Sequence, residues 1–171
     1  EAFDASDGNF RIRASLTLSA PNGAEQWRVG VSYNITWSVV GTIPNVKLEY
    51  SRDNFAADIQ TILASTPNDG TQAWNVPDAI SNTVKVRVSD PNDAGAYDDS
   101  NANFRITANF VVTAPNGGQN WKVGESQNIT WTWGGMAAND KQEYSTNGGA
   151  TFTVIGNTIN DGSNPWTIPD A

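Results

Sequence analysis

The stretch Ala20 to Trp37 reads APNGAEQWRVGVSYNITW, and it returns 94 residues later, at Ala114 to Trp131, as APNGGQNWKVGESQNITW. Twelve of the 18 positions are identical in the two copies. The opening segment AFDASDGNFRI, Ala2 to Ile12, matches AYDDSNANFRI, Ala96 to Ile106, at the same spacing. A fixed period of domain length indicates a tandem array of similar domains. Arrays of this kind are usually structural or adhesive.

Short strands are predicted throughout each copy. Val84, Val86 and Val88 alternate with polar residues, which is the pattern of a strand with one buried face. Similar alternation occurs around Ile35 to Val39 and Val46 to Tyr50, and the segments between are rich in Pro, Asn, Asp and Gly, which favour turns. The sequence therefore predicts an all-β protein of tandem immunoglobulin-like, or fibronectin-like, antiparallel β-sandwiches with a period of about 94 residues.

The repeat also sets the expected domain boundaries. Residues 1–12 match the last strand of a repeat, so we expect them to be the terminal strand of a preceding copy. Residues 13–106 are predicted to form a complete sandwich. Residues 107–171 are predicted to form a second sandwich that stops before its last strands, because no segment after Ala171 matches residues 80–94. We expect the chain to be part of a longer secreted protein.

Several motifs together carry a family resemblance. They are APNGxxxWxVGxxxxITW in both copies, the strand VKLEYS, the turn WNVPD, and the pair VKVRVSD and NFRI. This set resembles the immunoglobulin-like domain of fungal cell-wall-synthesis proteins and of Ser/Thr-rich GPI-anchored surface proteins, and similar repeats in large secreted proteins of bacteria and archaea. The resemblance implies a β-sandwich and an extracellular, cell-surface location. It implies no catalytic residues.

Composition narrows the possible functions. The chain has no Cys and no His, which removes disulfides, thiol nucleophiles, His-based acid–base catalysis and the usual zinc sites. The net charge of −8 argues against binding to nucleic acid or to anionic membrane surfaces. The sequence contains no apolar run long enough to insert into a membrane. We therefore expect a non-enzymatic protein without a required cofactor.

The tryptophans are expected to fill the core. Trp37 and Trp131 share strand parity with Ile35 and Ile129, and Trp27 and Trp121 follow a Pro-Asn-Gly turn where they would close one end of each sandwich. The alternative is a carbohydrate-binding surface, which needs exposed, coplanar aromatic rings. Its candidate is Trp133, which stands where the first copy has Val39.

An acidic segment precedes the last strand of the first copy. It offers Asp90, Asp93, Asp98 and Asp99 as candidate metal ligands, and calcium binds six to eight oxygen atoms of this kind. The segment lacks the EF-hand pattern, and Asp-rich and Asn-rich loops are also ordinary solvated turns. Both interpretations stay open, and a calcium ion here would stiffen a domain junction.

Two triplets match the acceptor sequence for N-glycosylation. They begin at Asn34 and Asn128, at equivalent positions of the two copies. Because Ile35 and Trp37 are predicted to face the core, Asn34 should face solvent.

One difference between the copies conflicts with the predicted core. The inward-facing Val46 and Leu48 correspond to Asp140 and Gln142 in the second copy. A buried unpaired carboxylate is costly, so this strand must pair differently or face a different partner.

These observations predict an extracellular structural repeat protein, such as a component of a surface filament, stalk or surface layer. The alternative is a binding module, either an adhesin or a carbohydrate-binding module that recognises a polysaccharide. An unfinished sandwich exposes a backbone edge that invites strand addition. We therefore expect the strand at Glu1 to Ile12 to pack on the second domain of a neighbouring copy, head to tail. The alternative is that the chain ends have no role in assembly.

Overall fold

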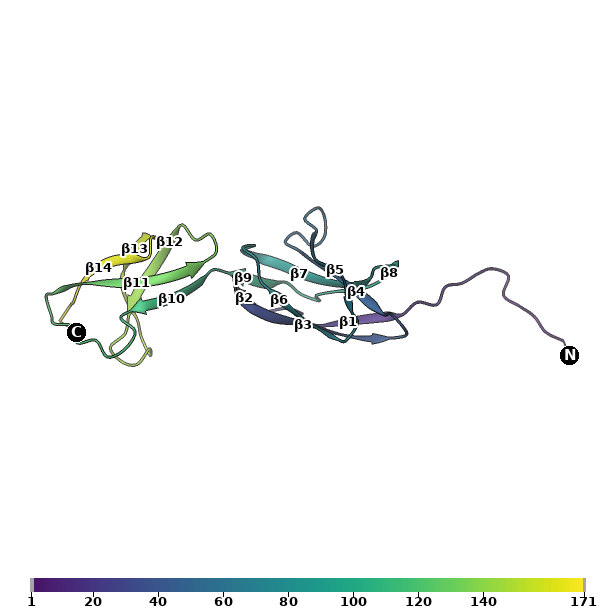
Figure 1. Cartoon of the computed structure of the whole chain (residues 1–171), viewed down its shortest axis with the longest axis horizontal. Helices are drawn as coiled ribbons and strands as arrows, with labels where there is room; N and C mark the ends of the chain where they lie inside the picture. Colours follow the sequence, from purple (N-terminus) through teal and green to yellow (C-terminus); the bar gives the residue numbers. More distant parts are fainter. Residues whose placement is uncertain (1, 171) are drawn as a thin grey trace. The chain divides into compact units, whose positions relative to one another are not determined.

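The computed structural model describes residues 2–170, which form strands and turns without a helical segment (Figure 1). The predicted all-β class is confirmed, and the sheets are built from antiparallel strand pairs. None of these residues belongs to a helix that is long and apolar enough to cross a membrane. The chain divides into two compact units: residues 1–26, 32–74 and 81–105, and residues 27–31, 75–80 and 106–171. Glu1 and Ala171 lie outside the described residues.

The first nine strands build two sheets. One has the order β1-β3-β6, formed by β1 (Ser15–Ala20), β3 (Ser32–Val40) and β6 (Thr71–Asn75). The other has the order β2-β9-β7-β4-β5, and β8 pairs with β7 beside this path. Its strands are β2 (Gln26–Arg28), β4 (Asn45–Ser51), β5 (Gln60–Pro67), β7 (Ser81–Asp90), β8 (Asp93–Asp99) and β9 (Phe104–Thr107).

The core of this sandwich lies between the two sheets. The predicted alternation holds on β7, where Val84, Val86 and Val88 are fully buried. Burial of each large apolar side chain contributes roughly 1.5–3 kcal/mol. Other large core residues include Leu16, Leu18, Ile35, Trp37, Val46, Leu48, Phe104 and Ile106.

The last five strands repeat part of this arrangement. One sheet has the order β10-β11-β14, formed by β10 (Asn109–Ala114), β11 (Ser126–Gly134) and β14 (Ser163–Thr167). The other pairs β12 (Asn139–Tyr144) with β13 (Thr153–Ile159). The pairing of β1 with β3 shifts register between Leu18 and Ala20, and that of β10 with β11 shifts between Val112 and Ala114. The sequence repeat thus corresponds to a repeated strand pairing.

The terminal strand expected at residues 1–12 is not present as a strand in the described part. Residues 2–14 form no strand, and Phe10 and Ile12 are 75% and 89% exposed. A strand forms only where a neighbouring strand accepts its backbone hydrogen bonds. The matching residues Phe104 and Ile106 find such neighbours because β9 lies between β2 and β7.

Candidate functional site

The second unit has an open sheet edge. In the first unit, β4 pairs with β5 on one side and with β7 on the other, where Leu48 lies opposite Val88. The equivalent strand β12 pairs with β13, and within residues 2–170 its second edge has no partner strand. An unpaired edge presents backbone donors and acceptors to another chain.

Apolar side chains of β10 are exposed beside this edge. Leu16 and Leu18 on β1 are 6% and 1% exposed, whereas Phe110 and Val112, at the same positions of the repeat, are 42% and 49% exposed. In the first unit β7 and β8 contact β1 and cover it. The described part of the second unit has no counterpart of these two strands. Exposure of β10 therefore follows from missing neighbours and not from a change in residue type.

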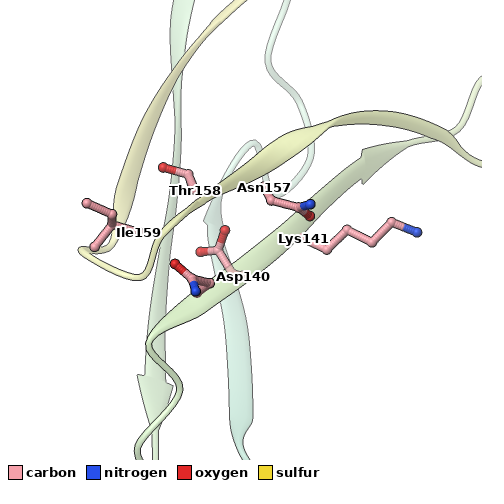
Figure 2. A pocket seen from close by; sticks show the side chains of 6 residues that line it. Asp140, Lys141, Asn157, Thr158 and Ile159 are labelled. Carbon is pink, nitrogen blue, oxygen red and sulfur yellow. The ribbon is translucent and has the colours of Figure 1, made fainter.

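A cavity of about 360 Å³ opens between the two sheets of the second unit. Apolar residues line one side and the backbone segment 139–143 of β12 lines the other; the apolar residues are Phe110, Val112, Ile129 and Trp131. A wider hollow of about 700 Å³ lies over β12 and β13 and shares residues 139–141 with it. Figure 2 shows the side chains around this hollow, among them Asp140 and Thr158. We call these two adjacent spaces the open face.

The two polar residues that replace core positions line the cavity. Gln142 is 9% exposed, and its Oε1 accepts a hydrogen bond from Asn164 Nδ2 at 2.8 Å. Its Nε2 lies 3.4 Å from Asp140 Oδ1. Asp140 Oδ2 is buried and has no hydrogen-bond partner within residues 2–170. Burial raises the pKa of Asp140, and the contact with Gln142 lowers it.

The tryptophans have different environments in the two units. Trp27, Trp37 and Trp131 are buried, with exposed fractions of 5–6%. Trp121 departs from the expectation of a core residue, because it is half-buried and its ring centroid lies 6.3 Å from that of Trp166 at an interplanar angle of 68°. Trp133 is 44% exposed.

A polar contact that the sequence did not predict holds the core tryptophan of each unit. Trp37 Nε1 donates to Asn68 Oδ1 at 2.6 Å, and Asn68 Nδ2 donates to the carbonyl of Ile43 at 2.8 Å. The second unit repeats the contact between Trp131 Nε1 and Asn160 Oδ1 at 2.7 Å. Asn68 and Asn160 each begin an Asn-Asp-Gly triplet, a composition that by itself indicates only a turn. Both the triplet and the tryptophan that it contacts recur in the second copy, and this shared recurrence is the sequence signal for the contact.

The four candidate calcium ligands do not converge in this structure. Each carboxylate accepts from a different group: Asp90 from Asn92 N at 2.8 Å, Asp93 from Arg13 Nε at 3.0 Å, Asp98 from Leu18 N at 2.8 Å, and Asp99 from Arg87 Nε at 2.6 Å. Among the described residues no group of three or more acidic side chains is arranged to hold a metal ion. Calcium binding stays a prediction.

Asn34 and Asn128 are both exposed, on β3 and β11. Their side chains lie on the solvent side of strands whose neighbours Ile35 and Ile129 are buried. The positions are accessible to a modifying enzyme, and glycosylation stays a prediction.

Comparisons with known proteins were made at three levels. No family model matches the chain, and no curated protein matches it. Among solved structures, the fibronectin(III)-like modules of Clostridium thermocellum CbhA are similar at 18% sequence identity, with a TM-score of 0.33. The match covers 89% of this chain and 78% of that chain. A likeness at this level does not bear on function.

Proposed function

We propose that this chain is a non-enzymatic structural component of an extracellular assembly, in which the open face of the second unit binds another copy of the chain. The matched pair Leu18 and Val112 carries the proposal. One position of the repeat is 1% exposed in the first unit and 49% exposed in the second. The second unit therefore retains the inner surface of a sandwich without the strands that cover it.

Physical chemistry favours an occupant for this surface. Covering a large apolar side chain contributes roughly 1.5–3 kcal/mol, and Phe110 and Val112 are both about half exposed at the cavity. The adjacent edge of β12 offers backbone hydrogen bonds to an extended segment. Apolar contact and backbone pairing together are what strand addition requires.

Composition and the repeat support a structural role over a catalytic one. Chemistry that uses Cys or His is excluded because the chain has neither residue. Some of the acidic side chains are held in ion pairs, as Asp99 is with Arg87 and Asp58 is with Arg52. The extracellular location rests on the resemblance of the repeat to surface-protein domains and on the acidic composition.

The competing proposal is a carbohydrate-binding module. Stacking on sugar rings requires coplanar exposed aromatic rings. In the second unit, Trp166 lies at 68° to Trp121 and at 45° to Tyr144, so these rings do not form a flat platform. Trp133 is exposed, but no ring contact extends it into a surface within the described residues. These angles favour assembly over sugar binding.

Sedimentation equilibrium of the full chain tests the proposal. We expect mass to rise with protein concentration, and Val112→Glu to remove that rise because a charge would enter the cavity. Val111→Glu is the matched control, since Val111 is 50% exposed on the adjacent position of β10 and does not line the cavity. A chain that stays monomeric at every concentration, or an equal effect of the two variants, would refute the proposal.

A further inference from the structure

We infer that residues 4–12 of a second copy bind beside the open face, and that this segment is received by residues 112–119. The inference rests on the proposed self-association and specifies which parts of the chain meet. It starts from the first unit, where the equivalent contact is made within the chain.

In the first unit, the segment 98–105 is fastened along the segment 18–25. Six hydrogen bonds join the two segments without involving β7: Leu18 N to Asp98 Oδ2 at 2.8 Å, Ser100 Oγ to Pro21 O at 2.7 Å, Asn101 N to Asn22 Oδ1 at 2.6 Å, Ala102 N to Asn22 O at 3.3 Å, Ala24 N to Asn103 O at 3.3 Å, and Arg105 N to Glu25 O at 2.9 Å. In five of the six, a backbone N–H donates to an oxygen of an Asn, Asp or Glu residue in the other segment.

This fastening places apolar side chains in the core. Phe104 and Ile106 are 0% and 1% exposed, and Ser100 is 1% exposed. The segment 98–106 therefore both binds the loop after β1 and closes the sandwich.

The receiving half recurs in the second unit. Ala20 to Gly23 reads APNG, and Ala114 to Gly117 reads APNG. A Cβ on Gly23 would meet the Cβ of Ala102 at 2.7 Å, whereas a Cβ on Gly117 would meet nothing within 4 Å. The loop at residues 112–119 thus has the sequence that receives a segment in the first unit, and the space is open.

The inserted half recurs at the start of the chain. Residues 4–12 read DASDGNFRI and residues 98–106 read DDSNANFRI, with six of nine positions identical. The identities include the two groups whose side chains bond in the first unit, so Asp4 corresponds to Asp98 and Ser6 to Ser100. Phe10 and Ile12 correspond to the buried Phe104 and Ile106 and are 75% and 89% exposed here. Gly8 corresponds to Ala102, whose Cβ lies close to Gly23 in the first unit. Because Gly8 has no Cβ, the segment can approach the receiving loop closely.

Binding between copies has a geometric consequence. Each copy would use residues 4–12 as the inserted segment and its second unit as the receiver, so one contact leaves a free segment on one copy and a free receiver on the other. Such a contact is heterologous and propagates into a linear polymer.

Two variants that each disable one half test the inference. Phe10→Ser removes the inserted ring, and Val112→Glu blocks the receiver; Phe3→Ser is the control, because Phe3 is 93% exposed and precedes residues 4–12. We expect Phe10→Ser to raise the apparent Kd of self-association about 10- to 100-fold, the loss of one buried aromatic side chain. Phe3→Ser should leave the Kd unchanged. Phe10 lies outside every strand, and unaltered circular dichroism and melting would show that the fold is intact.

Mixing gives the sharper result. Phe10→Ser chains keep a receiver and Val112→Glu chains keep a segment, so an equimolar mixture should form complexes that stop at two chains. A wild-type chain that assembles while Phe10→Ser assembles equally well would overturn this inference and leave the proposed function standing. A wild-type chain that never assembles would refute the proposed function. Concentration-independent protection of Phe10 from solvent would mean that the segment folds back within its own chain, which would also overturn binding between copies.

Discussion

Removing the amide of Asn68 should show how much the stability of the first unit depends on one polar contact in its core. Asn68 accepts from the indole of Trp37, which is 5% exposed, and donates to the carbonyl of Ile43. Asn68→Ala deletes both bonds. Each is worth about 0.5–1.5 kcal/mol net, and Asn68 is itself half-buried, so water can replace part of the loss. We therefore expect a loss of about 2 kcal/mol, which lowers the melting temperature of a unit of this size by about 8–16 °C.

Urea titration followed by Trp fluorescence measures this loss, and a double-mutant cycle with Trp37→Phe assigns it. If the indole N–H is the main partner, Asn68→Ala should cost about 1 kcal/mol less in the Trp37→Phe background. Asp69→Ala, at the exposed neighbour, is the control. A cost for Asn68→Ala within about 0.5 kcal/mol of zero, the range of surface substitutions, would refute the reasoning. Additivity of the two changes would show that the contact with Trp37 carries no energy.

Three further changes test other parts of the structure. Leu18→Ala should destabilise the first unit by about 2–5 kcal/mol, whereas Val112→Ala should cost less than about 1 kcal/mol in dilute solution; equal costs by denaturant titration would contradict the open face. Hydrogen bonding from Arg52 lowers the pKa of Asp58 to about 2, so the stability that this pair contributes should be present above pH 4 and should disappear as the pH falls through about 2. Arg52→Gln should raise the pKa of Asp58 measured by NMR. An unchanged Asp58 titration would refute the assignment. Burial raises the pKa of Asp140, so the charged carboxylate opposes folding above that pKa. Asp140→Asn should therefore raise the melting temperature at pH 7, and the difference from the wild-type chain should disappear by about pH 3, where the carboxyl group is protonated. A gain in melting temperature that does not depend on pH would point to another cause.

The sequence was a reliable guide where one pattern repeats within a strand. The alternation at Val84, Val86 and Val88 predicted β7 and its buried face, because a strand with one side on the core must alternate. The same reasoning placed Ile35 and Trp37 inward on β3.

The prediction was weaker where burial depends on other strands. Trp121 matches the buried Trp27 in sequence but is half-buried, because burial is set by which strands cover a position and not by the residue alone. The side chains that hold the acidic segment were also beyond reach from the sequence, since Arg13 lies 80 positions from Asp93 along the chain. Gln142, which replaces an apolar core residue, is accommodated by a hydrogen bond from Asn164 on β14. The alternation of residues along β12 could not identify this partner.

If the open face binds a second copy as proposed, the unpaired oxygen of Asp140 influences which segment binds best. This oxygen is already buried without a hydrogen bond, so a wholly apolar segment adds no further cost there, whereas a segment that brings a donor to it would recover about 1–3 kcal/mol. The first unit has Val46 at this position, permanently covered by its own strands, and has no need to discriminate. A surface that stays uncovered until it meets its partner encounters many unrelated apolar peptides. In the proposed contact, the Asp140 carboxylate would favour a segment that supplies a hydrogen-bond donor over one that is only apolar.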